Sequence, residues 1–219
     1  MNISLPRAFY YKGKEPKHNF ARIENGQLII HGSLNVEDLM YNLTYCLKGT
    51  YCFYCNSKLS KSKRTLDHII PRDLGGPTIP DNLVPCCRNC NTQKSNLSLD
   101  DFLIYRKIDS QKEKHEFYQS CIQKQELIRK ETGFCLPSSL YENISLSEII
   151  VTIILDELPE AKKDELIKEY YAKYHSFKRP ILVDKNGYLL DGFKTVMFAK
   201  NNCISNLPAI VLENVRKEF

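Results

Sequence analysis

The sequence lacks a long hydrophobic segment. Its longest apolar stretch, residues 149–155, is interrupted by Thr152, whereas a helix that crosses a membrane needs about 20 apolar residues. The first residues, MNISLPRAFYYKGKEPKH, also lack the apolar core of a secretory signal. These absences predict a soluble protein of the cytoplasm that has no membrane contact.

A strong excess of charge and internal repeats are lacking as well. The 219 residues include 31 Lys and Arg against 26 Asp and Glu, so the formal net charge of +5 is only weak support for a polyanionic partner. Hydrophobic residues make up 42% and charged residues 26%, values that exclude a wholly disordered or collagen-like chain. The length predicts one large domain or two small ones.

The order of the expected elements predicts an α+β fold. Asn-Gly at residues 25–26 and again at 186–187 predicts a hairpin at each place. Helical patterns cover about 35–49, 98–108, 113–131, 160–175 and a short stretch from 193, and the last strand is expected at 208–212. We expect a first domain over residues 1–135 with its core at 50–96, a linker at 136–144 and a second module at 145–219.

The nine cysteines are clustered, with five of them between residues 52 and 90. Because no export signal is seen, disulfides are not expected, and the cluster indicates a metal site. Cys52 and Cys55 form one Cys-x2-Cys turn, and Cys87 and Cys90 form another. Two such turns supply four thiolates for a tetrahedral structural zinc ion. Cys86 would leave a Cys-x3-Cys spacing, so we expect it to be a buried neighbour.

Between and after these turns, polar residues follow in a definite order. The segment reads LDHIIPRDLGGPTIPDNLVP, and CNTQK starts at the last cysteine of the cluster. Asp67 and His68 fall at an expected strand end, a Gly-Gly loop follows, Asn82 precedes a second strand, and Asn91 and Lys94 enter a helix. In this order, over roughly residues 50–96, the sequence resembles the HNH nuclease family. The resemblance implies a ββα-metal fold that holds one catalytic divalent cation.

The resemblance also implies the catalytic residues. His68 is expected to activate water, because imidazole titrates near neutral pH. Asp67 and the side-chain carbonyl of Asn91 are expected to supply oxygen ligands for Mg²⁺ or Mn²⁺. Family members often have a further histidine where Asn91 stands, and the asparagine favours a cation that prefers oxygen. Asn82 is expected to brace the loop between the two strands.

Three basic residues beside the motif are candidates for binding the DNA backbone: Arg72, Arg88 and Lys94. Phosphate contacts of this kind position a nucleic acid without reading its sequence. Solvated surface charge explains each of these residues almost as well when it is taken alone.

The carboxy-terminal part carries a second resemblance. From Pro180 the chain reads PILVDKNGYLLDGFKTVMFAKNNCISNLPAIVL, and this order of strand, turn, strand, Gly, helix and strand resembles the amino-terminal domain of ParB and sulfiredoxin. In that family a basic residue, normally Arg, follows the Gly and binds nucleotide phosphate. Here Lys194 stands near that position, and a Lys does not replace the two-pronged Arg. We therefore expect a docking or DNA-binding module without nucleotide hydrolysis.

These patterns leave three hypotheses. The first is a metal-dependent endonuclease that hydrolyses DNA, with zinc as structural metal and Mg²⁺ or Mn²⁺ as catalytic metal. The second is a non-catalytic zinc module that binds DNA or a partner protein. The third is a nucleotide-responsive ParB-like switch whose output is the nuclease. A protein partner or a homodimer is an option alongside DNA.

Overall fold

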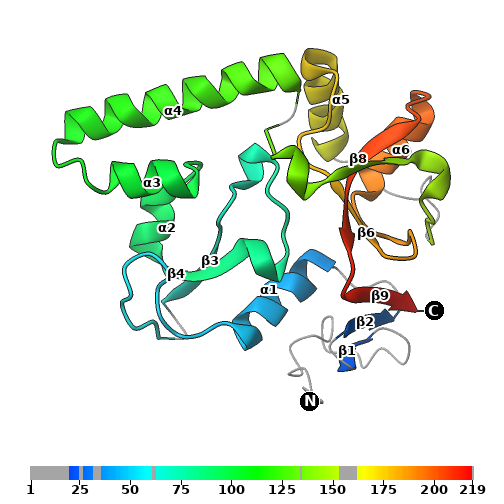
Figure 1. The fold of residues 1–219 in the computed structure, drawn as a ribbon, viewed down its shortest axis with the longest axis horizontal. Helices are drawn as coiled ribbons and strands as arrows, with labels where there is room; N and C mark the ends of the chain where they lie inside the picture. The colour runs from blue at the N-terminus through cyan, green and yellow to red at the C-terminus, as the bar shows by residue number, and fades with distance from the viewer. Residues whose placement is uncertain are drawn as a thin grey trace. The chain divides into compact units, whose positions relative to one another are not determined.

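The computed structural model describes residues 20–24, 27–31, 36–60, 63–133, 135–152 and 162–218. It mixes helices and strands, so the expected α+β class is confirmed (Figure 1). The chain divides into two compact units. The sheet unit comprises residues 1–42, 137–172 and 180–219, and the cysteine unit comprises residues 43–136 and 173–179.

The cysteine unit is built on one antiparallel hairpin and the helices that follow it. Strand β3 (Arg64–His68) pairs with β4 (Leu83–Cys87), from Arg64 opposite Cys87 to His68 opposite Leu83. β4 continues directly into helix α2 (Arg88–Lys94), and α3 (Leu99–Tyr105) and α4 (Gln111–Thr132) follow (Figure 1). The strand end at His68 and the helix around Asn91 were both expected from the sequence.

Helix α4 begins and ends as its sequence predicts. The Ser110 side chain accepts a hydrogen bond from the Glu113 amide at the start of the helix, and Gly133 ends it with a φ of 72°. A glycine adopts this left-handed conformation without the steric penalty of a side chain.

A small core joins the hairpin to the helices. Its buried members come from the cysteine turns, from β4 and from the three helices: Cys52, Tyr54, Leu59, Val84, Cys86, Cys90, Leu97, Phe102 and Cys121. Four of these nine are cysteines, which bury less apolar surface than leucine or phenylalanine. A core of this kind gives limited stability by itself, so a bound metal would add substantially to it.

The loop between β3 and β4 is closed on itself. The Asn82 side chain accepts a hydrogen bond from the Ile70 amide at 2.9 Å and donates to the carbonyls of Ile70 and Pro77 at 3.1 and 2.9 Å. Gly76 passes so close that a Cβ there would lie 1.8 Å from the Ile70 carbonyl oxygen. The expected bracing asparagine and the Gly-Gly sequence therefore shape the same loop.

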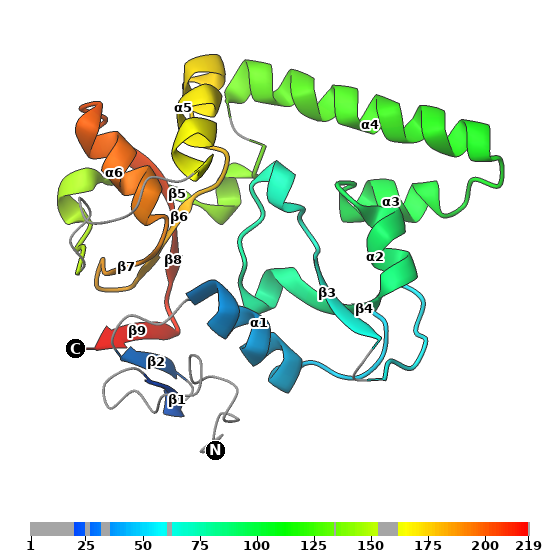
Figure 2. The ribbon, with the colours of Figure 1, turned by 180° about the vertical axis from the view of Figure 1, so that it is seen from behind.

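The sheet unit contains a four-stranded sheet in the order β5-β8-β6-β7. Its strands are β5 (Glu142–Ser145), β6 (Ile181–Asp184), β7 (Leu189–Asp191) and β8 (Asn206–Leu212). β6 runs parallel to β8, whereas the two outer pairs are antiparallel. Helix α6 (Phe193–Asn201) packs beside β6 (Figure 2). Tyr171 of α5 (Lys162–Tyr174) places its ring 5.3 Å from that of Phe198.

A second sheet brings the two ends of the chain together. β2 (Gln27–His31) pairs antiparallel with β1 (Phe20–Glu24) and parallel with β9 (Val215–Glu218). The first expected hairpin is thus confirmed, although its turn residues 25–26 lie outside the described residues. β9 was not expected, because its sequence VRKEF carries only a weak strand pattern.

The units differ in extent from the expected domains. Residues 20–42 group with the sheet unit, and helix α1 (Val36–Leu47) runs from that unit into the cysteine unit. The expected linker at 136–144 contains a 3-10 turn (Ser138–Leu140) and the first residues of β5. A capping box of Ser145 and Glu148 opens the 3-10 turn Leu146–Glu148.

Among the helices of the described segments, none is both long and apolar enough to span a bilayer.

Candidate functional site

Four cysteine side chains converge in the cysteine unit. Cys52 and Cys55 come from the loop between α1 and β3, Cys87 ends β4 and caps α2, and Cys90 lies in the first turn of α2. Their four sulfur atoms all lie within 4.8 Å of one another. Cys86 points elsewhere, since it is fully buried and contacts the Thr65 hydroxyl at 3.2 Å. The expected four-cysteine cluster is therefore present.

The spacing of these sulfurs suits a tetrahedral metal ion. Zinc–sulfur bonds of about 2.3 Å put tetrahedral ligand sulfurs roughly 3.8 Å apart, and the Cys55 and Cys87 sulfurs are 3.9 Å apart. Hydrogen bonds from Ser57 lower the pKa of the Cys55 thiol to about 6, which favours the thiolate form that binds metal. The two tight turns thus bring four sulfur atoms around one point, where they could bind a metal ion.

Asp67 lies at the end of β3, where two donors meet one of its oxygens. The Tyr54 hydroxyl donates to Oδ2 at 2.5 Å, and the Lys94 ammonium lies 3.0 Å from the same atom. Burial, followed by the hydrogen bond to Asp67, raises the pKa of the Tyr54 phenol, so it remains a donor. All three side chains are largely or wholly buried. The carboxylate is therefore held in one orientation, with Oδ1 as the oxygen that can face a cation.

His68 is the next residue along β3, and it is 8% exposed. Its Nε2 lies 2.9 Å from the Thr78 hydroxyl oxygen, in the loop that Asn82 closes. Burial, and to a smaller extent the positive charges of Arg72, Arg179 and Lys94, together lower the pKa of the imidazole to about 4. At neutral pH the ring is consequently uncharged.

Asn91 reaches this strand from helix α2. Its Nδ2 donates to the Thr65 hydroxyl at 3.2 Å and to the Leu66 carbonyl at 3.4 Å. Because the amide nitrogen is directed at β3, the carbonyl oxygen is turned away from those two acceptors. Two adjoining elements thus carry the three groups: β3 carries the carboxylate and the neutral imidazole, and α2 carries the amide, which contacts β3 two residues and one residue before Asp67.

The comparison with family models identifies this region. Residues 52–97 match the model described as HNH endonuclease. This segment is an HNH domain. It begins at Cys52 of the four-cysteine cluster and ends at Leu97, shortly after α2, and Asp67, His68, Asn82 and Asn91 all lie inside it.

Two known proteins are similar to parts of the chain. The CRISPR-associated endonuclease Cas9 of Corynebacterium diphtheriae is 34% identical over 71 residues, which is 32% of this chain and 6% of that protein. A solved Pnob8-like ParB-N domain is 20% identical and covers 32% of this chain and 28% of its own, with a TM-score of 0.27. The chain thus spans a small part of the length of the curated relative that it matches.

The basic residues beside the HNH motif have different surroundings. Arg88 is exposed at the start of α2, and Arg72 is half-buried in the 3-10 turn Arg72–Leu74. Lys94, in contrast, has no exposed side-chain surface. Besides Asp67, its ammonium contacts the His68 carbonyl oxygen at 2.6 Å. Lys94 is therefore built into the interior of the HNH domain.

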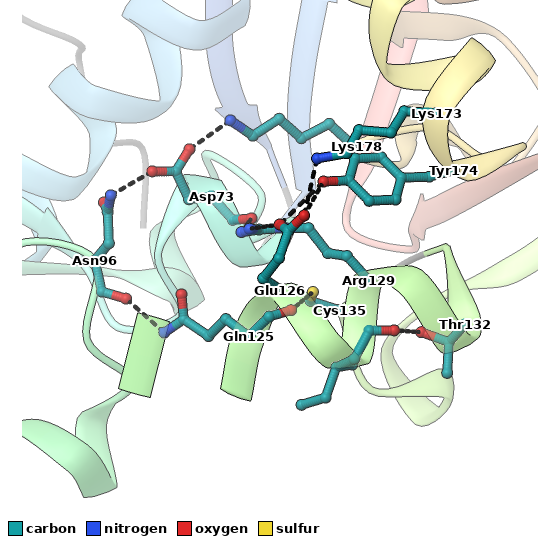
Figure 3. Close-up of polar contacts among 11 residues, drawn as sticks. Asp73, Asn96, Gln125, Glu126, Arg129, Thr132, Cys135, Lys173, Tyr174 and Lys178 are labelled. Atoms are coloured by element: carbon teal, nitrogen blue, oxygen red, sulfur yellow. Dashed lines mark hydrogen bonds and ion pairs between the residues drawn. The ribbon is translucent and has the colours of Figure 1, made fainter. Parts of the chain in front are cut away.

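The turn that follows His68 is held by residues from distant parts of the cysteine unit. Asp73 forms an ion pair with Lys178 at 2.5 Å, accepts a hydrogen bond from Asn96, and receives a bond from Arg129 on its carbonyl at 2.6 Å (Figure 3). Glu126 of α4 binds Lys173 and Tyr174 at 2.8 and 2.7 Å. Residues 173–179 are thus joined to the rest of the cysteine unit by polar contacts, of which the Lys178–Asp73 pair reaches the HNH domain.

Three residues of the HNH site escaped the sequence analysis. Tyr54 packs on Phe102, as an aromatic residue in such a turn commonly does, but it also donates to Asp67. Thr78 stands in the Gly-Gly loop with nothing to distinguish it from a turn residue. Arg179, whose charge acts on His68, lies over a hundred positions along the chain from it, and no local pattern relates the two.

Proposed function

We propose that the protein is a metal-dependent endonuclease that hydrolyses phosphodiester bonds of DNA. The observation that supports this most is the end of β3, where a neutral, buried His68 stands next to a carboxylate fixed by two donors. This combination offers a base beside a cation ligand, which is what metal-assisted hydrolysis requires.

His68 is the proposed general base. Nε2–H donates to the Thr78 hydroxyl in this proposal, which leaves Nδ1 as the unprotonated nitrogen that accepts the proton of the attacking water. Burial keeps the ring uncharged, so the base is in its working form at neutral pH. The closed loop around Asn82 keeps Thr78, and through it the ring, in one position.

The catalytic cation would be held by Asp67 and Asn91. Both offer oxygen atoms, the ligand type that Mg²⁺ and Mn²⁺ prefer, and Asp67 still has Oδ1 to offer when Oδ2 binds Tyr54 and Lys94. When bound, such a cation neutralises charge that develops on the phosphate and on the leaving oxygen. Two protein ligands leave room for water and for the scissile phosphate.

The four-cysteine cluster is the proposed site of a structural zinc ion. Four sulfur ligands from two turns form a closed tetrahedral set, which is typical of structural zinc. Cys90 starts the helix that carries Asn91 and Lys94. Zinc at this position would therefore fix α2 against the hairpin and keep Asn91 close to β3.

Arg72 and Arg88 are the proposed contacts to the DNA backbone, and Arg179 joins them. Arg72 and Arg179 both act on His68 through their charge, so both lie where a phosphate near the base would be attracted. For Lys94 we propose a different role from the one its sequence position suggested. It neutralises Asp67 in the interior and ties His68 to α2.

One observation favours the alternative of a non-catalytic zinc module. Asp67 already has an ion-pair partner in Lys94, so its charge is balanced without a metal. In that case the domain would bind DNA through its basic residues and hydrolyse nothing.

A plasmid-nicking assay separates the two. The purified protein with Mg²⁺ should nick supercoiled DNA, chelation of Mg²⁺ should stop the reaction, and His68→Ala should be inactive while keeping its zinc. DNA binding without any Mg²⁺-dependent nicking by the wild type would favour the non-catalytic alternative.

A further inference from the structure

We propose that Tyr54 is a positioning residue that couples the four-cysteine cluster to the hydrolytic site by orienting Asp67. The inference rests on the proposed function, because it assigns to Asp67 the role of cation ligand. It concerns a residue that lies inside a metal-binding turn but offers no ligand to that metal.

The Tyr54 backbone belongs to the cysteine turn. The residue stands between Cys52 and Cys55, and the turn is closed by the Cys52 amide, which donates to the Ser57 carbonyl at 2.8 Å. The Phe53 amide donates to the Pro85 carbonyl at 2.9 Å, which ties the turn to β4. Any change that loosens the two thiolates from their metal therefore moves the Tyr54 backbone.

The Tyr54 ring is equally fixed. It is 9% exposed and meets Phe102 edge to face, with 5.2 Å between ring centroids. Arg106 donates to the Tyr54 carbonyl at 2.5 Å from the other end of α3. Phe102 thus packs against the ring while Arg106 holds the backbone, and the hydroxyl reaches Oδ2 of Asp67.

The geometry at Asp67 explains why this hydroxyl matters. Tyr54 and Lys94 approach the same oxygen from two elements, the cysteine turn and α2. Two donors on one oxygen fix the rotation of the carboxylate and direct Oδ1 away from them. With Lys94 alone, the carboxylate can turn about its ion pair, and Oδ1 loses its fixed direction.

Loss of such a supporting hydrogen bond typically weakens a metal site about 10- to 100-fold. Tyr54→Phe removes the hydroxyl and keeps the ring, so the packing on Phe102 and the cysteine turn should persist. We expect the Mg²⁺ concentration for half-maximal cleavage to rise at least about 10-fold, with the zinc content and the KM for DNA unchanged. Tyr51→Phe is the matched control, since Tyr51 borders the same turn with 53% exposure.

The experiment measures two quantities. Cleavage is titrated with Mg²⁺ in wild type, Tyr54→Phe and Tyr51→Phe, and Mn²⁺ binding is followed by electron paramagnetic resonance in the His68→Ala background with and without Tyr54→Phe. Weaker Mn²⁺ binding with Tyr54→Phe supports the inference even if the wild type cleaves nothing, in which case the proposed function alone fails.

Three outcomes would overturn the inference. One is a wild type that cleaves and a Tyr54→Phe variant with the same Mg²⁺ dependence. Another is Mn²⁺ binding that Tyr54→Phe leaves unaltered. The third is loss of zinc from Tyr54→Phe, because it would show that the hydroxyl stabilises the cysteine turn and does not act by orienting Asp67.

Discussion

The four-cysteine cluster and the proposed hydrolytic site lie in one HNH domain but offer different kinds of ligand atom. The cluster offers four soft sulfur ligands from two turns, which would complete the tetrahedral shell of a zinc ion without a water ligand. The hydrolytic site offers one carboxylate, one amide and one neutral imidazole, which leaves a cation open to water and substrate. The first arrangement suits a structural metal and the second suits a reactive one.

The two sites nevertheless share their supports. Helix α2 carries Cys90 for the cluster and Asn91 and Lys94 for the hydrolytic site within seven residues. An isolated helix of that length is not stable in water, so its position depends on the cluster and on the buried ion pair. Perturbing the cluster should therefore disturb both sites, whereas perturbing the hydrolytic site should leave the cluster intact.

The largest effect is expected from removing one ligand of the cluster. Cys90→Ser should lower the zinc content and unfold the HNH domain, because metal binding of about 10 kcal/mol or more is folding energy in such sites. Elemental analysis and circular dichroism check this. Cys203→Ser, at an exposed cysteine outside the cluster, is the control and should be neutral. A folded, zinc-free Cys90→Ser variant would show that the domain does not need the metal-bound cluster to fold.

A smaller effect is expected from the buried ion pair. Lys94→Met should lower the free energy of unfolding by about 3–5 kcal/mol, because it leaves Asp67 charged and buried with Tyr54 as its remaining described partner. Added Mg²⁺ should restore part of this loss by supplying a positive charge near Asp67. Lys112→Met, at an 85% exposed surface pair, should change the free energy by less than about 1 kcal/mol. Chemical denaturation with and without Mg²⁺ measures both.

The loop between the strands offers a third test. In Gly76→Ala the new Cβ would lie 1.8 Å from the Ile70 carbonyl and 3.0 Å from Asn82 Nδ2, so the loop must shift. We expect a loss of about 1–3 kcal/mol in stability and slower cleavage, with the zinc content unchanged. Gly49→Ala is matched to it, since a Cβ at Gly49 has nothing within 4 Å. Equal behaviour of the two variants would contradict this view of the loop.

The smallest effect is expected from pH. Because the pKa of His68 is about 4 and its ordinary value is 6.5, the unfolded chain binds more protons between these values. His68 therefore contributes stability that is fully present above pH 6.5 and is lost as the pH falls toward 4. In the same window the base stays neutral, so the profile of kcat/KM should have no inflection near 6.5 that depends on His68. An inflection there that His68 variants abolish would contradict the buried, neutral ring.

The sequence predicted the HNH domain better than it predicted the rest of the chain. Cys-x2-Cys turns, Asp67-His68 and Asn82 lie within a short stretch whose local geometry their spacing encodes, so the hairpin, the cluster and the helix were all foreseeable. The burial of Tyr54 and Lys94 could not be foreseen, because burial is a property of the folded core: the same aromatic and the same lysine also fit a surface turn.

Contacts across long sequence separations could not be predicted at all. The Lys178–Asp73 pair joins residues 105 positions apart, and β9 pairs with β2 across most of the chain. A charged pair or a short strand has no partner-specific pattern in one sequence. The grouping of residues 173–179 and 20–42 in the two compact units rests on such contacts and has no signal in the local sequence.

The role of His68 as the base of a Mg²⁺-dependent nuclease is the central proposal, and one measurement tests it directly. Supercoiled plasmid is incubated with Mg²⁺ and either wild type or His68→Ala, after elemental analysis has established equal zinc content in both. We expect nicking by the wild type and a nicking rate about 10²- to 10⁴-fold lower in the variant, with melting temperatures that show both to be folded. Nicking by zinc-loaded His68→Ala at the wild-type rate would contradict it.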